Sequence, residues 1–598
     1  MLGFSRPGSR GETGADPRQA RQDGRVRQAR QGTGAPGLLR RIRRSKAVLR
    51  AGVGLAVLAL TATTAACSDE SSTSGGESIL RVTGAPTGPL IRNFNPYLTT
   101  SPVNLVGGSS MIHEPLFIPN TLKVGSYTPW LAKTWEFSAD GKQLTLNLQS
   151  GVKWTDGQPF SAEDVAFTLN MLVKNPALNA NGIVLTEAKA EGPDKVVISF
   201  PMPSFTQLPF IGITYIVPKH KWGSVADPGT FNDENPVGTG PFMLETWSAQ
   251  GYFLKKNPNY WQVGKPKIDG LRYVTFNSNV SANLALSQGQ LDWTGNFVNN
   301  IESDYVGKDP EHNKYWFPAI VPTFLSLNLT KPQWQNADVR KAISLALDRD
   351  ELVRLAEQNQ QPANKTPTGL VMPQHEPFLA DKYKGVEIKQ DVNQAKALMQ
   401  KAGYTIGGDG YANGPDGKRL TLTLSTSSGF TDILTMYQVM TEQLKKIGIE
   451  VKVEPKATAE WIANLFVGNF DGSTFGPLAG AFTPFDVYQR TLAGYLTKPV
   501  GEPAFVNVVR WKDAETDKLL MQYAGTTDAA LQKQALEGLQ TIMAEQVPVI
   551  PLFNFVSWDE YTTKNFVGWP DKDNPYSVGS PIGPSSVLVA TSLEPRQK

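Results

Sequence analysis

The first part of the hydrophobic pattern predicts a strand, a hairpin and a helix in close succession. Residues 79–82 alternate apolar and polar side chains as a strand does, and residues 135–148 alternate as a hairpin with its turn at Asp140-Gly141. A helix pattern begins at Ser161, which is followed three residues later by an acid, as in a capping box. This segment therefore mixes α and β structure.

The later pattern repeats the order strand, helix, strand. Expected strands are residues 324–328, 420–424, 449–453 and 548–556; expected helices begin at Asn336 and cover 391–402, where Gly403 stops the helix, and 435–447. This order predicts α/β packing. The 598 residues, 40% of them hydrophobic, are enough for at least two cores, and the sequence shows no short repeat typical of a solenoid.

The first 66 residues have the pattern of an export segment. Six basic residues lie between positions 40 and 50, and the 16 residues 51–66 carry no charge. The apolar centre at 55–60 is short for a transmembrane helix, which needs about 20 apolar residues, but it suits a signal peptide. We expect residues 1–66 to be a cytoplasmic or disordered tail and a signal peptide that is removed; a short uncleaved anchor is the alternative.

The small residues of this segment end at Thr64-Ala-Ala-Cys67, which is similar to the lipobox of bacterial lipoproteins. Thr64 stands where the lipobox usually has Leu. Cys67 is the only cysteine, so no intramolecular disulfide can form. The resemblance implies a lipid on Cys67, a membrane anchor, and a polar Gly/Ser-rich tether over residues 67–78.

The export segment also explains the charge of the chain. Residues 1–50 carry 13 Lys and Arg against three acids, which leaves 45 basic and 52 acidic residues and a net charge of −7 for the rest. The remaining body is therefore mildly acidic. No basic stripe with interleaved aromatic residues is present in it, so we expect no nucleic-acid partner.

Three runs of sequence resemble one known family. They are residues 129–170, with a W-x-x-x-x-D-G-K hairpin and a following G-V-K-W-x-D-G-x-P-F loop, residues 236–261, and residues 328–348. In this order they resemble the family 5 extracellular solute-binding proteins of ABC importers, which include oligopeptide-, dipeptide- and nickel-binding proteins. Within these runs, Gly238 and Gly240 predict a tight turn rather than a phosphate cradle.

The resemblance implies a two-lobed α/β clamshell of the periplasmic-binding-protein type (type II, cluster C) with an extra third domain. The chain would cross between the lobes near Pro322 and Phe555. The expected division is lobe I at 79–322 plus 555–598, with the extra subdomain at 113–235, and lobe II at 323–554. Ligand would close the lobes by a hinge motion, and the closed form would dock on the permease subunits.

The resemblance implies peptides as the first ligand class. Peptide-binding members hold the ligand main chain by backbone hydrogen bonds, and an acid near a strand-ending Trp pairs with the peptide amine. The corresponding stretch here is 470–486, where Phe475 replaces the Trp and Asp486 is the nearest acid. This departure leaves oligosaccharides as the alternative ligand.

Oligosaccharide-binding members use aromatic faces and amide side chains. Residues 291–297 resemble their cleft segment, so we expect Trp293 to be a stacking platform and Asn296 a hydrogen-bonding group. Further candidate ligand contacts are Trp461, Phe482 and Trp558. For each Trp, a place in the core is the competing interpretation.

No catalytic or metal motif changes this interpretation. The four histidines share no metal-ligand spacing, so we expect no metal site and no cofactor, and nickel is disfavoured. The chain lacks G-x-S-x-G and HExxH, which disfavours a secreted hydrolase, although a carboxylate pair for glycoside cleavage stays open. A sensor that docks on a receptor is a further alternative. We expect a monomeric, non-enzymatic binding protein, lipid-anchored on the outer face of the bacterial plasma membrane or periplasmic.

Overall fold

The computed structural model describes residues 77–84, 86–98, 101–476 and 481–597, which belong to one structural unit, Ser74–Lys598. The signal peptide at 1–66 and Cys67 lie outside the described residues. Within the described ranges, no helix combines the length and the apolar character needed to span a membrane.

A seven-stranded sheet contains the first strand and part of the C-terminal region. Its order is β12-β20-β11-β1-β10-β9-β8, and β1 runs parallel to both β10 and β11. The bounds are β1 Ile79–Thr83, β8 Phe242–Ser248, β9 Gly251–Lys256, β10 Gly270–Val274, β11 Trp293–Thr294, β12 Asn313–Tyr315 and β20 Glu560–Thr562. Strand β1 confirms the first predicted strand.

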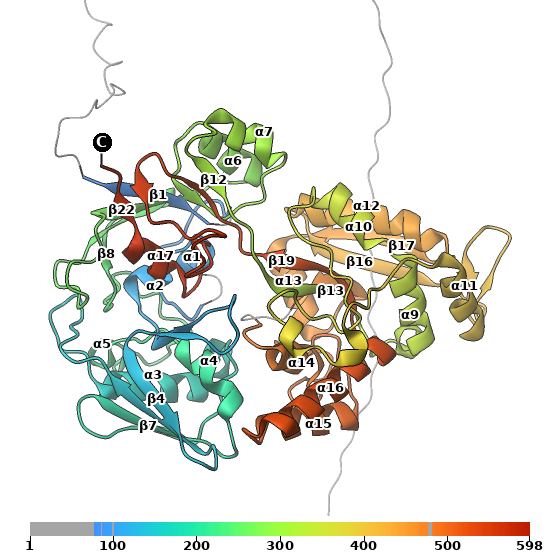
Figure 1. The fold of residues 1–598 in the computed structure, drawn as a ribbon, viewed down its shortest axis with the longest axis horizontal. Helices are drawn as coiled ribbons and strands as arrows, with labels where there is room; N and C mark the ends of the chain where they lie inside the picture. The colour runs from blue at the N-terminus through green and yellow to red at the C-terminus, as the bar shows by residue number, and fades with distance from the viewer. Residues whose placement is uncertain (1–76, 85, 99–100, 477–480, 598) are drawn as a thin grey trace, which may run out of the picture. The chain divides into compact units, whose positions relative to one another are not determined.

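A five-stranded sheet contains the later predicted strands. Its order is β17-β16-β18-β13-β19, with β16 parallel to β17 and β18. The strand bounds are β13 Ala319–Leu327, β16 Thr421–Ser427, β17 Glu450–Lys456, β18 Gly472–Phe475 and β19 Ile550–Val556. The α-helices of this region are α8 Pro332–Gln335, α9 Ala337–Ala346, α10 Arg349–Ala356, α11 Val392–Lys401, α12 Thr431–Lys445, α13 Thr458–Val467, α14 Pro484–Leu492, α15 Ala514–Ala524 and α16 Ala529–Gln546 (Figure 1). The strands and helices predicted for this half are confirmed.

The chain passes between these two sheets twice. It leaves the seven-stranded sheet after β12 and enters the five-stranded sheet with β13, and it returns between β19 and β20. Strands β13 and β19 are antiparallel neighbours, with Val321 opposite Phe555 and Pro322 opposite Asn554. The proposed lobe boundaries at 322 and 555 therefore lie within one strand pair.

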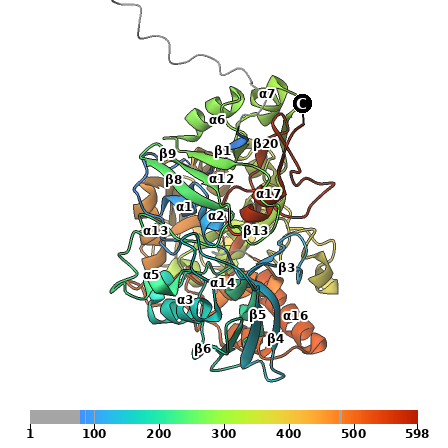
Figure 2. The ribbon, with the colours of Figure 1, turned by 90° about the vertical axis from the view of Figure 1, so that its left-hand side faces the viewer.

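A separate four-stranded sheet, β4-β5-β7-β6, lies within the region expected as an extra subdomain. It consists of β4 Ala132–Phe137, β5 Gln143–Leu148, β6 Glu187–Ala190 and β7 Lys195–Ser199, and α3 Ala162–Lys174 packs on it (Figure 2). The backbone N–H of Ser161 donates to Asp164 Oδ2 at 2.9 Å, which confirms the predicted capping box. The boundaries of the extra subdomain at residues 113 and 235 stay a prediction.

Two of the family-like runs meet at one buried carboxylate. Glu114 accepts hydrogen bonds from Trp130 Nε1 at 2.7 Å, Tyr260 Oη at 2.6 Å and Trp261 Nε1 at 3.0 Å. Burial nevertheless raises the pKa of Glu114 to about 7. Trp130 and the Tyr260-Trp261 pair thus hold the fold together around this group.

The glycines of the second run have a different role from the expected turn. Neither Gly238 nor Gly240 has a positive φ. A Cβ at Gly238 would lie 1.8 Å from the carbonyl oxygen of Ile112, and one at Gly240 would lie 2.2 Å from that of Met111. The tight-turn prediction is wrong, because these positions need glycine for close backbone approach.

Candidate functional site

Polar side chains form a row where parallel strands of the seven-stranded sheet end. Thr83 ends β1 and Thr294 ends β11, and these two residues are register partners. Thr294 is in turn opposite Glu560 of β20. Ligand sites of α/β sheets lie outside the carboxyl ends of parallel strands, so this row is a candidate site.

Glu560 organises the row through one of its two carboxyl oxygens. Its Oε2 accepts hydrogen bonds from Thr294 Oγ1 at 2.8 Å and from the backbone N–H of Asn296 at 3.2 Å. Its Oε1 has no hydrogen-bond partner among the described residues. Burial raises the pKa of Glu560 to about 8, so the carboxyl can be protonated, and donate a hydrogen bond, at neutral pH.

The predicted hydrogen-bonding residue Asn296 lies beside this carboxyl. Its side chain is 2% exposed, and neither its amide nitrogen nor its amide oxygen has a partner among the described residues. The buried hydroxyls of Thr83 and Ser557 are also without one. An unpaired buried polar group costs about 1–3 kcal/mol, so this set favours a bound polar group that completes it. Ligand binding by Asn296 stays a prediction.

Trp293, the predicted stacking platform, lies in the hydrophobic core. The residue is fully buried, and its indole N–H donates to the carbonyl oxygen of Gly579 at 2.6 Å and to Asp559 Oδ1 at 3.1 Å. Its ring meets that of Trp569 edge-on at 5.7 Å. These contacts agree with the competing interpretation of a core aromatic residue, and the stacking role stays a prediction.

Trp558 belongs to a less buried aromatic cluster near Asn296. Its ring lies edge-on to Phe297 at 5.8 Å and to Phe317 at 4.8 Å. Phe297 and Phe317 were not among the predicted ligand contacts. Phe297 directly follows Asn296 in the chain, and that adjacency was the available signal.

Trp461 and Phe475 come together at the carboxyl ends of β16 and β18. Their ring centroids are 6.5 Å apart, and Trp461 Nε1 donates to Ser473 Oγ at 3.0 Å. Phe430, which directly precedes α12 and is 40% exposed, packs edge-on to Trp461 at 5.6 Å. The structure therefore unites two predicted residues and adds Phe430 to them.

Phe482 and Asp486 lie at the start of α14. Asp486 Oδ2 accepts a hydrogen bond from the backbone N–H of Thr483 at 2.8 Å, in a capping box, and burial raises the pKa of Asp486 to about 7. Phe482 meets Phe210 edge-on at 5.5 Å. Asp486 thus caps the N-terminus of α14. That it pairs with a ligand amine stays a prediction.

A loop from the five-stranded region contacts the chain just after Asn296. Gln358 Oε1 accepts from the backbone N–H of Asn300 at 2.8 Å, and Gln360 Nε2 donates to the carbonyl oxygen of Val298 at 2.7 Å. Gln358, Asn359 and Asn300 all have positive φ, which costs a non-glycine residue about 1–2 kcal/mol. Segment 296–300 and loop 357–361 therefore form one joint, which no local sequence pattern indicates.

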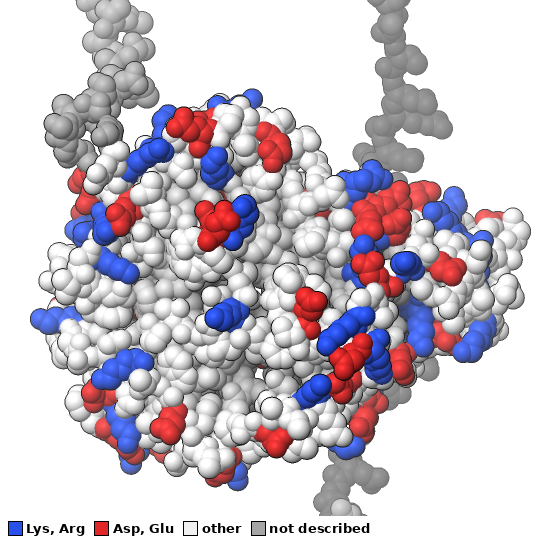
Figure 3. Space-filling model, viewed as in Figure 1, with Lys and Arg blue, Asp and Glu red and all other residues white. Residues whose placement is uncertain are grey.

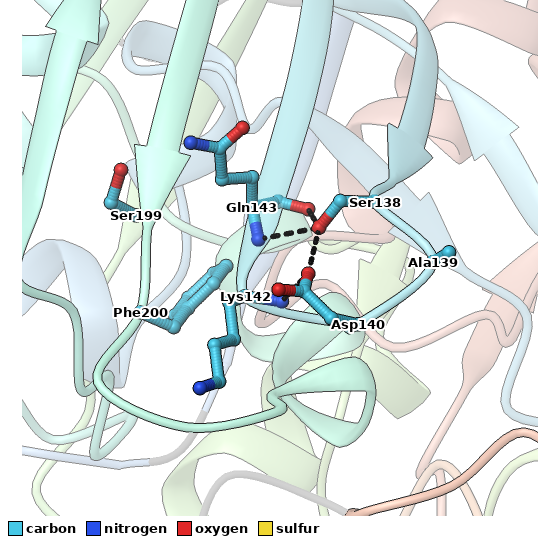
Figure 4. Close-up of a pocket in the computed structure, with 7 residues that line it drawn as sticks. All are labelled: Ser138, Ala139, Asp140, Lys142, Gln143, Ser199 and Phe200. Atoms are coloured by element: carbon cyan, nitrogen blue, oxygen red, sulfur yellow. Dashed lines mark hydrogen bonds between the residues drawn. The ribbon is translucent and has the colours of Figure 1, made fainter.

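A surface depression of about 590 Å³ at the β4–β5 turn is a poor candidate for the ligand (Figure 4). Two of its polar side chains already pair within the turn: Ser138 Oγ donates to Asp140 Oδ1 at 2.7 Å and accepts from the backbone N–H of Gln143 at 2.9 Å. The Ser138 hydroxyl holds the pKa of Asp140 below its usual range. These contacts stabilise the β4–β5 turn and do not indicate a ligand.

Within the described residues, neither the surface charges nor possible metal ligands form a competing site. The face shown in Figure 3 intersperses basic and acidic side chains, and ion pairs such as Lys401–Asp338 and Lys365–Asp350 lie on the five-stranded region. Over the part of the chain that the structure describes, no three His, Cys, Asp or Glu residues gather as metal ligands would.

Comparison with known proteins places these features in context. Residues 126–496, more than half of the chain, match the family model described as bacterial extracellular solute-binding proteins, family 5 middle. The glutathione-binding protein GsiB of Shigella flexneri is 26% identical over 444 residues, which cover 71% of this chain and 79% of that protein.

Solved structures show the same fold. The mannohexaose-bound periplasmic oligopeptide-binding protein of Thermotoga maritima superposes with a TM-score of 0.77 at 24% identity, covering 87% of this chain and 99% of that chain. The oligopeptide-binding protein AppA of Bacillus subtilis, in complex with a nonapeptide, gives 0.70 at 20% identity, with coverage of 87% and 99%. The predicted two-lobed α/β clamshell is confirmed.

Proposed function

Because the chain belongs to the family 5 bacterial extracellular solute-binding proteins, we propose that it captures small peptides and delivers them to the permease of an ABC importer. It is a binding protein, not an enzyme, and it acts outside the cytoplasm. Hinge closure around the peptide would create the form that docks on the permease.

The observation that supports a peptide best is the unpartnered amide of Asn296 beside Glu560. A peptide group presents one N–H donor and one carbonyl acceptor, and an Asn side chain presents the complementary acceptor and donor. A protonated Glu560 would offer one more donor to a carbonyl oxygen. The relatives named for glutathione and crystallised with a nonapeptide agree with this ligand class.

An oligosaccharide is the second candidate ligand. The aromatic clusters around Trp558 and Trp461 supply ring faces of the kind that sugars stack on. The Thermotoga maritima relative was crystallised with mannohexaose. Both observations keep this ligand class in competition with peptides.

Attachment to the membrane through a lipid on Cys67 is part of the proposal. The signal-peptide pattern and the position of Cys67 at its end support it. We also propose that the protein works as a monomer. An acidic body on a Gly/Ser-rich tether would stand clear of the bilayer.

The test of the ligand class is stabilisation by defined ligands. Purified residues 68–598 would be heated with di- to pentapeptides and, separately, with cello-, chito- and xylo-oligosaccharides. A ligand at a hundredfold excess over its Kd stabilises the folded state by about 2.7 kcal/mol. An increase in Tm with peptides alone ends the sugar alternative, and an increase with oligosaccharides alone ends the peptide proposal.

A further inference from the structure

Two acidic residues outside the row around Glu560 meet at one end of a helix pair. Glu357 directly follows α10, and Asp432 lies in the first turn of α12. The helices pack antiparallel: Gln443, near the end of α12, accepts a hydrogen bond from the backbone N–H of Asp348, which caps the start of α10. Glu357 and Asp432 therefore lie together at the other end of the helix pair, away from Asp348 and Gln443.

The groups around Glu357 have unused acceptors. Glu357 is fully buried, and its Oε2 accepts from Gln361 Nε2 at 2.7 Å. Gln360 Nε2 donates to the carbonyl oxygen of Val298. The remaining oxygens, Oε1 of Glu357, Gln360 and Gln361, are buried and have no partner among the described residues. While Glu357 is ionised, all three of these oxygens are acceptors, so a partner for the set has to be a donor.

The acidic pair also lacks a compensating cation. Neither carboxyl group has a Lys or Arg among the described groups that act on it. Burial and the charge of Asp432 raise the pKa of Glu357 to about 8. The C-terminal end of α10 carries a partial negative charge, which also disfavours an anion there. A bound cation would relieve each of these costs.

The pair lies next to the features described for the ligand. Asp432 follows Phe430 by two residues, and Phe430 packs on Trp461 at the carboxyl end of β16. On the other side, loop 357–361 bonds to the segment directly after Asn296. Aromatic rings near such a pair add attraction for a cationic group.

We propose that Glu357 and Asp432, with the free amide oxygens of Gln360 and Gln361, bind a cationic nitrogen group of the ligand. An ammonium group carries three N–H donors and a guanidinium five, and neither has an acceptor, which matches the acceptors that the set presents when Glu357 is ionised. The inference rests on the proposed peptide function. Segment 470–486 has no acid at the position where peptide-binding members place the partner of the peptide amine. Glu357 and Asp432 would take over that role.

The test uses two pools of mixed tri- to hexapeptides, one unmodified and one with every amine acetylated. The full protein would be incubated with each pool, and the retained peptides would be identified and quantified by mass spectrometry. Glu357→Gln and Asp432→Asn would be compared with Asp350→Asn, an exposed acid of α10, as the matched control. The Tm of each ligand-free variant reports folding.

The expected result is retention of the unmodified pool and loss of the acetylated peptides that lack arginine. Glu357→Gln and Asp432→Asn should each reduce retention about tenfold or more, since hydrogen bonds to charged groups contribute about 1.5–3 kcal/mol. The control should retain peptides as the parent does. Retained sequences without Lys or Arg enrichment identify the α-amine as the cation, and enrichment identifies a side chain.

Two results overturn the inference in distinguishable ways. If acetylated peptides without arginine are retained as well as unmodified ones, or if both variants behave like the control, the acidic pair does not bind the ligand although the peptide function stands. If neither pool is retained while an oligosaccharide raises the Tm, the peptide function fails, and this inference fails with it.

Discussion

At the scale of single residues, the candidate site consists of polar groups that the fold buries without completing their hydrogen bonds. Asn296 is the sharpest case, because neither end of its amide has a partner among the described residues. By contrast, Asn328 is equally buried but donates to the carbonyl oxygens of Gly468 at 2.9 Å and Phe470 at 3.1 Å. The first pattern favours binding, and the second stabilises the fold.

We therefore predict opposite outcomes for two asparagine variants. Asn296→Ala should weaken peptide binding about 2- to 150-fold, because one or two hydrogen bonds of about 0.5–1.5 kcal/mol each are lost. It should leave the ligand-free Tm unchanged or raised. Asn328→Ala, the control, should lower the Tm and leave affinity nearly unchanged. Calorimetric titration and thermal unfolding measure both; a lower Tm for Asn296→Ala would assign that residue to structure.

Buried carboxyl groups predict a loss of stability with rising pH. The folded state raises the pKa of Glu560 from its ordinary 4.5 to about 8, so between these values the folded protein binds more protons than the unfolded chain. The free energy of unfolding then decreases as pH rises through this range. His113 and His375, whose pKa values burial lowers, act in the opposite sense until their unfolded-state imidazoles have lost their protons, about one pH unit above the ordinary value of 6.5.

The window from about pH 7.5 to 8.5 therefore isolates the carboxyl groups. Chemical denaturation across it should show stability decreasing, and Glu560→Gln should make the decrease smaller. Glu502→Gln, at an exposed position, is the control and should keep the parent slope. An unchanged slope in Glu560→Gln would mean that this carboxyl titrates alike in both states.

At the scale of elements, α14 is fastened to the segment around Phe210. The guanidinium of Arg490 lies 4.0 Å from the ring centroid of Phe210, and its Nη2 donates to the carbonyl oxygen of Asn181 at 2.8 Å. Arg490 is almost fully buried, so its charge is poorly hydrated and the cation–π contact is strong. This contact joins sequence segments that lie about 300 positions apart.

A double-mutant cycle should detect that contact. Arg490→Met and Phe210→Leu are each expected to lower the free energy of unfolding, and their coupling should be about 0.5–2 kcal/mol. Urea denaturation of the parent, both single variants and the double variant supplies the four values. Additive effects would show that the ring and the guanidinium act independently.

Local signals predicted the elements better than they predicted the site. The cap residues Ser161 and Asn336 were found because capping needs only neighbouring residues. Helix α12 begins four residues before its prediction, because its N-cap is Phe430, whose side chain makes no capping hydrogen bond and so gives no start signal. The Thr483–Asp486 capping box was a local signal too, yet Asp486 was interpreted as a ligand group.

Contacts between segments that are distant in the chain could not be predicted from the sequence. The site depends on strand register, which places Thr83, Thr294 and Glu560 in one row. It depends also on the joint between loop 357–361 and the segment after Asn296. Trp293 illustrates the same limit, because its type suggested stacking while its neighbours in the folded chain place it in the core.

At the scale of the whole molecule, charge and attachment are linked. The chain after residue 50 carries a net charge of −7. Anionic lipid surfaces attract basic segments, so this body gains no electrostatic attraction to such a membrane. Retention at the membrane then depends on the lipid proposed for Cys67, whose two acyl chains would give stable anchoring at about 0.8 kcal/mol per buried CH₂.

Cys67→Ala should therefore move the protein out of the membrane fraction. We expect either release into the medium or accumulation of an unprocessed precursor, because the variant has no thiol to receive the lipid. Fractionation, and mass spectrometry of the mature N-terminus, distinguish these two results from the anchored parent. Ser68→Ala, one residue further on, is the control and should stay membrane-bound with the lipid mass. A Cys67→Ala protein retained in full at the membrane would show that another part of the chain, such as an uncleaved 51–66 segment, holds it there.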